Sequence, residues 1–188
     1  IMRMLMIVDP QVDFISGTLP VDGAAEAMDA LAAYLLATDG AYAAKVVTAD
    51  HHPFFHSSFT DKGGEWPRHC VADTVGAAIW PALVDPLYLT SGNVTVVHKG
   101  TSADTDEYSV FRNPLGAADV KKIVEQAGIT DIDICGIAGD VCVLNTLADA
   151  ARLFGAEALR VLTRFSPSLD GGAALDSFIA RNNLKCDR

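Results

Sequence analysis

Ile132-Asp-Ile-Cys-Gly-Ile-Ala-Gly-Asp-Val-Cys-Val-Leu-Asn145 passes from an apolar run through small residues into a new helical period. This pattern predicts a buried strand, a tight turn and a helix that begins near Asp140. Cys142 would lie in the first turn of that helix, where unpaired backbone N–H groups and the helix dipole favour a thiolate. Free cysteine is also common as a small core residue, so the local context leaves a nucleophile and a packing role both open.

Similar apolar runs recur along the chain and alternate with helical periods. They predict strands at residues 4–8, 45–49, 94–98, 132–137 and 159–163. Helices are predicted around residues 28–35, 120–127, 143–154 and 175–179, with Gly128 and Gly155 ending the second and third. Because this alternation is typical of parallel βαβ units, we expect a three-layer α/β/α fold with a central, mostly parallel sheet of five or six strands.

One segment, residues 50–86, breaks this rhythm. It is long, contains Pro and Gly, and holds most of the histidines of the chain. Long irregular segments in compact domains are usually functional, so we expect a metal-binding insertion here. At 188 residues, the sequence predicts one domain over residues 1–188, without an interdomain linker.

Composition and charge narrow the class of protein. The formal net charge is −10, and no basic stripe is present, so we expect neither a nucleic acid nor an anionic membrane as partner. The longest apolar stretches are strand-length or interrupted by charge, so no membrane span is predicted. The four cysteines are dispersed, without a Cys-x-x-Cys motif, which favours a reduced, cytoplasmic protein. The choice between monomer and homo-oligomer stays open.

Chemically active side chains stand at or just after four of the predicted strands. In chain order they are Asp9, Asp50, Lys99 and Cys142. Each one alone is equally consistent with a turn, a helix cap or a solvated charge. In parallel α/β sheets, however, ligands bind at the carboxyl ends of the strands. Together these residues would supply a nucleophile, a carboxylate base and a cation, which suits acyl transfer.

A second group of polar residues begins at Asp50. In an extended segment, Asp50 and His52 point to the same side because side chains alternate. His69 would complete a set of three N/O ligands with positions open for water or substrate, as in catalytic metal sites. His56 is either a further ligand or a hydrogen-bond partner of one. Histidine-rich loops also occur without metal, so the spacing alone leaves that alternative open.

Five motifs, in this order, resemble the nicotinamidase/pyrazinamidase group of the isochorismatase-like cysteine hydrolases. They are Ile7-Val-Asp-Pro-Gln-Val-Asp-Phe14, Thr48-Ala-Asp-His-His-Pro53, Trp66-Pro-Arg-His-Cys70, Val97-His-Lys-Gly100 and Gly136-Ile-Ala-Gly-Asp-Val-Cys142. The likeness extends over residues 4–163. It implies hydrolysis of nicotinamide to nicotinate and ammonia, and of pyrazinamide to pyrazinoate, in NAD salvage.

The resemblance also implies a role for each matching residue. The catalytic triad would be Asp9, Lys99 and Cys142. The peptide between Ile137 and Ala138 would be cis, and the backbone N–H groups of Ala138 and Cys142 would form an oxyanion hole.

The resemblance further implies a cofactor and a substrate pocket. The ligands of one divalent metal ion would be Asp50, His52 and His69. The ion would be zinc, with iron or manganese as alternatives. The walls of a pyridine pocket would be Phe14, Trp66 and Tyr108, although core packing is the usual role of such rings.

The sequence departs from the family pattern at three places. Val12 stands where the family often has a polar residue. Gly139 replaces the threonine of a common Ala-Thr-Asp motif, and Arg164-Phe-Ser-Pro-Ser168 replaces an aspartate followed by small residues. These changes leave the triad and the metal ligands intact and concern the shape of the site.

Two other functions compete with nicotinamide hydrolysis. The first is a related amidohydrolase that uses the same triad on a carbamoyl or ureido substrate. Such relatives generally lack the Asp-x-His plus His set, so Asp50, His52 and His69 favour nicotinamide. The second is a binding protein that keeps the fold without the activity. Relatives of that kind usually lose the nucleophile, whereas Cys142 is present.

Overall fold

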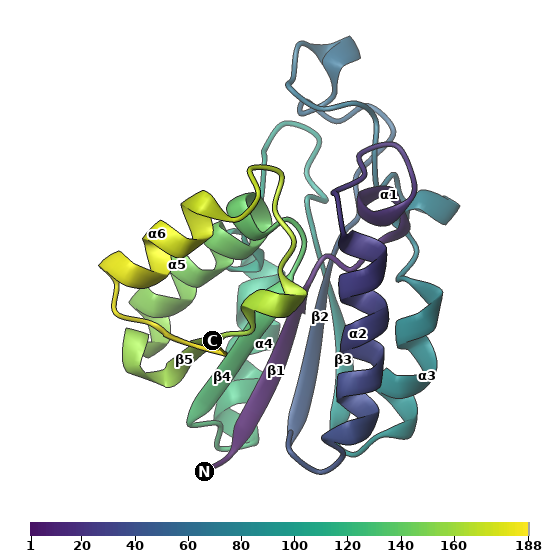
Figure 1. Ribbon diagram of the computed structural model, residues 1–188. Helices are drawn as coiled ribbons and strands as arrows, with labels where there is room; N and C mark the ends of the chain where they lie inside the picture. Colours follow the sequence, from purple (N-terminus) through teal and green to yellow (C-terminus); the bar gives the residue numbers. More distant parts are fainter. Residues whose placement is uncertain (188) are drawn as a thin grey trace.

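The computed structural model describes residues 1–187 and contains a sheet of six parallel strands (Figure 1). The strands are β1 (Arg3–Val8), β2 (Ala44–Asp50), β3 (Asn93–Lys99), β4 (Asp131–Gly136), β5 (Leu159–Val161) and β6 (Lys185–Cys186). Their order across the sheet is β3-β2-β1-β4-β5-β6. The predicted α/β fold is therefore confirmed, and the sheet is parallel throughout.

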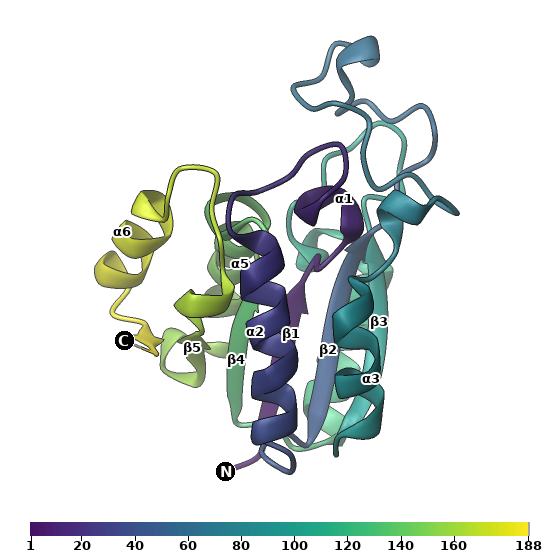
Figure 2. The ribbon, with the colours of Figure 1, turned by 45° about the vertical axis from the view of Figure 1, so that its right-hand side comes forward.

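Helices cover both faces of the sheet. They are α1 (Val12–Ile15), α2 (Ala24–Ala37), α3 (Pro81–Leu89), α4 (Pro114–Gln126), α5 (Leu144–Phe154) and α6 (Ala173–Arg181). Helices α2 and α3 lie on one face, and α4, α5 and α6 lie on the other (Figures 1 and 2). No helix within residues 1–187 has both the length and the apolar character needed to cross a membrane.

The central strand β1 supplies side chains to two separate apolar cores. Leu5 and Ile7 pack with Met28 and Leu31 of α2, whereas Met4 and Met6 belong to the core beneath α4, α5 and α6. Side chains alternate along a strand, so a strand covered by helices on both faces must be apolar at every position. This explains why the sequence of β1 is a continuous apolar run.

The path of the chain creates a crevice between β1 and β4. The first three strands proceed outward from β1 to one edge, and β4 then returns to the other side of β1. Ligands in open α/β sheets bind at such a switch point, beyond the carboxyl ends of the strands. Asp9 follows β1 at this point, and the N–H of Ile137, after β4, donates to the carbonyl of Val8 at 2.8 Å.

Two strands end earlier than predicted, and one short strand was not predicted. β4 ends at Gly136, whose φ of 128° favours glycine and where a Cβ would lie 2.1 Å from the carbonyl oxygen of Val8. β5 ends at Val161, because the N–H of Thr163 donates to Oδ1 of Asp187 at 2.6 Å. β6 has only two residues, too few to produce a periodic pattern.

A helix begins within the last part of the segment 50–86, where the sequence predicted none. Residues 81–86 belong to helix α3, which begins at Pro81 and buries Leu83 and Leu87. Pro86 lies inside this helix. Because proline is rare in helix interiors, the sequence of this stretch resembles a loop. The remainder is irregular apart from the short turns at Thr60–Lys62 and Val75–Ala77, and it extends beyond the carboxyl end of the sheet (Figure 1).

The turn after β4 contains the two features that the sequence singled out. The peptide between Ile137 and Ala138 is cis, as the family resemblance implies. The helix expected near Asp140 begins as a π-helical turn over Gly139–Val143 and continues as α5. Gly155, with a φ of 86°, ends α5 as predicted.

Candidate active site

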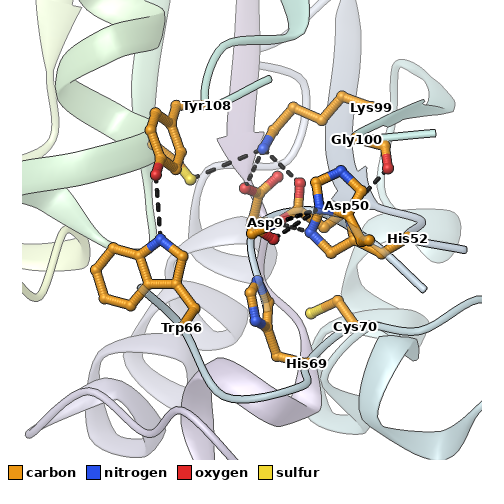
Figure 3. Close-up of polar contacts among 12 residues, drawn as sticks. Asp9, Asp50, His52, Trp66, His69, Cys70, Lys99, Gly100 and Tyr108 are labelled. Atoms are coloured by element: carbon orange, nitrogen blue, oxygen red, sulfur yellow. Dashed lines mark hydrogen bonds and ion pairs between the residues drawn. The ribbon is translucent and has the colours of Figure 1, made fainter. Parts of the chain in front are cut away.

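Three of the strand-end side chains meet in one buried cluster. Nζ of Lys99 lies 2.7 Å from Oδ2 of Asp9 and 3.7 Å from Sγ of Cys142 (Figure 3). Asp9 and Lys99 are fully buried and Cys142 is 6% exposed. The structure thus brings together the nucleophile, carboxylate and cation that the sequence proposed, and their catalytic roles stay a prediction.

Asp9 is fixed by β2 as well as by Lys99. Its backbone has a φ of 46°, and its N–H donates to the carbonyl of Thr48 at 3.0 Å. The hydroxyl of Thr48 donates to Oδ1 of Asp9 at 2.7 Å. Each carboxylate oxygen therefore has its own partner, Thr48 for Oδ1 and Lys99 for Oδ2. Sequence reasoning missed Thr48, although a polar residue within the apolar run of β2 was an available signal.

Burial and charge determine the resting protonation of the cluster. Burial opposes charge on Lys99, but Asp50, Asp9 and Cys142 outweigh it, so the pKa of Lys99 is raised well above its ordinary value. Burial raises the pKa of Asp9, and Lys99 offsets only part of that rise. Lys99 is therefore a permanent cation beside a carboxyl whose proton affinity is increased.

The surroundings of the Cys142 thiol also shift its pKa. Burial raises the pKa of Cys142 well above its ordinary value; Lys99 opposes this rise, whereas Asp9 and Asp50 add to it. The predicted preference for a thiolate is thus not seen in the resting site, because burial and two carboxylates outweigh the helix end and Lys99. Cys142 therefore rests as a thiol.

The candidate metal ligands form a second buried cluster. Asp50, His52 and His69 each offer a ligand atom, and these atoms lie within 4.8 Å of one another. Nδ1 of His52 is 2.8 Å from the carbonyl of Gly100, and Nδ1 of His69 is 2.8 Å from the carbonyl of Pro67. A carbonyl only accepts, so each Nδ1 donates and each neutral ring keeps a bare Nε2. One carboxylate and two such imidazoles fit a divalent metal ion.

The charge states of Asp50 and His69 agree with that fit, whereas His52 is paired with Asp50 in place of an ion. Burial acts to raise the pKa of Asp50, but Lys99 and His52 outweigh it and hold the pKa well below its ordinary value. Burial lowers the pKa of His69, which keeps that ring neutral. Burial also acts to lower the pKa of His52, but Asp50 outweighs it and raises the pKa. In this structure Asp50 is therefore the anion that pairs with His52. A bound metal cation would take over that pairing.

Asp50 joins the two clusters. Its Oδ1 accepts a hydrogen bond from Nζ of Lys99 at 2.7 Å, and its Oδ2 lies 3.4 Å from Nε2 of His52 (Figure 3). Its backbone is held in turn by Gln11, whose Oε1 accepts the N–H of Asp50 at 2.8 Å and whose Nε2 donates to its carbonyl at 2.8 Å. Sequence reasoning missed Gln11, which stands two residues after Asp9 in the first family motif.

His56 lies beside the ligand set. Its Nδ1 is 2.7 Å from the hydroxyl of Ser58, and its Nε2 is 3.2 Å from the carbonyl of Thr105. Its ring packs on that of His52 with 4.2 Å between centroids. Both nitrogens are thus occupied, and His56 is in neither of the two groups of described residues that could share an ion. The structure favours a supporting role for His56 and not a place in the ligand set.

Both clusters open into one cavity. It measures about 490 Å³ with its open mouth included. The predicted aromatic residues line it, and Nε1 of Trp66 donates to the hydroxyl of Tyr108 at 3.1 Å (Figure 3). Sequence reasoning missed the aliphatic part of the wall, which is Leu19, Val21, Val141 and Leu169. It also missed Glu107, a buried residue of the wall whose Oε2 has no hydrogen-bond partner among residues 1–187.

The turn that would form the oxyanion hole is tightly folded. The carbonyl of Ala138 accepts the N–H groups of Val141 and Val143, each at 3.1 Å. Ala138 and Cys142 both line the cavity. Their N–H groups as donors to an oxyanion stay a prediction.

Two of the departures from the family pattern touch each other. The N–H of Gly139 donates to the carbonyl of Pro167 at 2.8 Å. A Cβ at position 139 would lie 2.3 Å from Oγ of Ser168 and 2.6 Å from the carbonyl of Ser166. A larger residue at 139 would therefore require the segment 164–168 to move, so the two changes form one structural unit.

Comparison with known proteins identifies the relatives of this chain. The isochorismatase domain family matches residues 3–157. The nicotinamidase/pyrazinamidase of Mycobacterium tuberculosis is 38% identical over 184 residues, covering 95% of this chain and 91% of that protein. The pyrazinamidase of Pyrococcus horikoshii in complex with zinc superimposes with a TM-score of 0.82 at 30% identity, covering 99% of this chain and 98% of that one. An L. infantum protein in complex with nicotinate gives a TM-score of 0.86 at 27% identity, covering 100% and 92%.

Proposed function

The chain belongs to the isochorismatase family, and we propose that it is a metal-dependent cysteine amidohydrolase that converts nicotinamide to nicotinate and ammonia. Pyrazinamide, with the same carboxamide on a similar ring, would give pyrazinoate. One observation carries the proposal: Cys142, the three candidate metal ligands and three aromatic side chains line a single cavity. The nicotinamidase relatives described above, one of them in complex with nicotinate, support this substrate class.

The metal and the rings would hold the substrate. Asp50, His52 and His69 would bind one divalent ion, for which we propose zinc, the metal in the P. horikoshii structure; iron and manganese accept the same ligand types. A bound ion would supply a Lewis acid that fixes the pyridine nitrogen and withdraws electron density from the ring. Phe14 and Trp66 would contact the flat ring from the cavity wall.

The first half of the reaction would form a thioester. Asp9 accepts the proton of the Cys142 thiol, and the sulfur attacks the carboxamide carbon. The N–H groups of Ala138 and Cys142 stabilise the oxyanion; one such donor is typically worth about 3–4 kcal/mol. Asp9 then gives its proton to the amide nitrogen, the C–N bond breaks, and ammonia leaves.

The second half would release the acid. Asp9, again a carboxylate, accepts a proton from water, and the resulting hydroxide attacks the thioester carbon. The C–S bond breaks, and the Cys142 sulfur recovers the proton from Asp9. Lys99 stays protonated throughout and stabilises whichever of Asp9 and Cys142 carries negative charge, which its raised pKa allows.

A small amide panel tests the proposal. Ammonia release is measured from nicotinamide, from benzamide, which lacks the ring nitrogen, and from a ureido acid, before and after metal chelation. We expect nicotinamide to be hydrolysed far faster than benzamide, with the advantage lost on chelation. Preference for the ureido acid, the substrate of the competing amidohydrolase class, would contradict the proposal.

A further inference from the structure

The turn of the nucleophile is fastened to a neighbouring segment, residues 166–172, which we name the strap. Oδ1 of Asp140 accepts the N–H of Leu169 at 3.0 Å, and Oδ2 accepts the N–H of Asp170 at 3.1 Å. The N–H of Gly139 donates to the carbonyl of Pro167 at 2.8 Å. These three hydrogen bonds, which we name the clasp, join two residues of the π-helical turn to the strap. Asp140 precedes Cys142 by two residues and does not line the cavity.

The far end of the strap is fastened to helix α6. Oδ1 of Asp170 accepts the N–H of Gly172 at 2.8 Å, and Oδ2 accepts the N–H of Ala174 at 2.8 Å. Asp170 lies two residues before Gly172, the N-cap residue of α6, and its carboxylate accepts N–H groups at the start of that helix. The Asp170 carboxylate thus fixes the chain that follows Leu169, whereas the N–H of Leu169 itself is held by Asp140.

The side chain that this arrangement presents to the cavity is Leu169. It lines the cavity together with Cys142 and Val141, yet 47% of its surface stays exposed. A large apolar residue held at a cavity mouth by its own backbone is not explained by core packing. Its position suits contact with part of a ligand that projects toward the mouth.

We propose that Leu169 is a specificity-determining residue that limits the size of substituents on the substrate ring, and that Asp140 is the positioning residue that holds it through the clasp. The identity of the ring rests on the proposed function. Removing Leu169 takes away the wall itself. Removing the Asp140 carboxylate leaves the Leu169 and Asp170 N–H groups without their acceptor and allows the wall to move.

A double-mutant cycle tests the proposal. The readout is the ratio of kcat/KM for a ring-methylated nicotinamide to that for nicotinamide, which does not depend on the fraction of folded enzyme. We expect Leu169→Ala to raise this ratio about tenfold, the low end of the discrimination that an apolar pocket achieves for one methylene. Asp140→Ala should raise it in the same direction, and the double variant should raise it no further than Leu169→Ala alone.

Asp170→Ala is the matched control, because it removes a carboxylate of the same strap but leaves the Asp170 N–H bonded to Asp140. Its ratio should equal that of the wild type. Hydrogen–deuterium exchange of the peptide containing Leu169 should be faster in Asp140→Ala than in this control. An unchanged ratio in Leu169→Ala, or additive effects in the double variant, would overturn the proposal.

A second readout keeps this inference separate from the proposed function. Cys142 is alkylated with N-ethylmaleimide and with the bulkier N-cyclohexylmaleimide, and the two rates are compared. Both Leu169→Ala and Asp140→Ala should favour the bulkier reagent relative to the wild type, whatever the natural substrate is. If nicotinamide releases no ammonia, the proposed function fails, whereas equal rate ratios in all variants would overturn the role of the strap.

Discussion

The two clusters of the site are held by different kinds of structure. Asp9 and Lys99 stand at the ends of β1 and β3, and Cys142 lies in the turn that β4 leads into. His52 and His69, by contrast, lie on the irregular chain after β2, where each ring is oriented by one backbone carbonyl. The sheet ladder thus places the atoms that would react, whereas loop hydrogen bonds place the atoms that would orient the substrate.

Asp50, the last residue of β2, belongs to both clusters. One of its oxygens accepts from Lys99 and the other faces His52. The two clusters should therefore differ in role although Asp50 connects them. Variants of the first cluster should lose chemistry and keep metal, whereas variants of the second should lose metal first.

The largest effect is expected for Cys142→Ala. Without sulfur no thioester can form, so ammonia release from nicotinamide should fall to background, while the metal content, measured by elemental analysis, should equal that of the wild type. Cys186→Ala changes a cysteine at the far edge of the sheet and serves as control. Near-wild-type turnover in Cys142→Ala would remove the cysteine mechanism.

The second largest loss of activity is expected for Asp9→Asn. An amide cannot accept the thiol proton, and a positioned general base typically contributes about 10²–10⁴-fold in rate. We expect kcat/KM for nicotinamide to fall by roughly that factor with bound metal retained. A loss of metal equal to the loss of activity would instead place Asp9 in the ligand set.

His52→Ala should lose bound metal first, unlike Asp9→Asn, which should lose activity and keep the metal. Metal binding should weaken by more than the roughly 10–100-fold typical of losing a partner that merely supports a ligand. The KM for nicotinamide should rise steeply, because the ring nitrogen loses its anchor. His51→Ala is the matched control, since His51 stacks on His98 outside the ligand group. Unchanged metal content in His52→Ala would exclude it as a ligand.

The smallest effect on activity is expected for Thr48→Val, and it should appear as a change in the pH dependence of kcat/KM. The Thr48 hydroxyl lowers the pKa of Asp9 against the rise caused by burial, so its removal should raise that pKa further. Asp9 must be ionised to act as base, so the acid limb of the kcat/KM profile should move to higher pH. A hydrogen bond of about 0.5–1.5 kcal/mol corresponds to a shift of about one pH unit or less. A shift to lower pH would contradict the assignment of Asp9.

Much of the fold could be predicted because local pattern and tertiary structure agree. The apolar runs of β1 and β2 are buried on both faces, so their ends were visible in the sequence, and with them Asp9 and Asp50. α3 was missed because Pro86 lies within it, and β6 because two residues carry no period. Local pattern fails where the partner that defines an element is distant in sequence.

The same limit applies to the site. Asp50, His52 and His69 could be grouped from spacing and family resemblance. Gln11 and Leu169 could not, because their roles depend on hydrogen bonds that span 39 residues to Asp50 and 29 residues to Asp140. The protonation of Cys142 was also misjudged, since the carboxylates beside it become neighbours only in the folded sheet.

The most direct test of two linked clusters with separate roles is made on the wild-type protein stripped of metal and titrated with zinc. Ammonia release from nicotinamide and alkylation of Cys142 are followed in the same samples. The account predicts that stripped protein hydrolyses little nicotinamide, that activity returns in proportion to bound zinc up to one ion per chain, and that Cys142 can be alkylated before any zinc is added. Full nicotinamide hydrolysis without metal, or a Cys142 that becomes accessible to the reagent only after zinc binds, would contradict it.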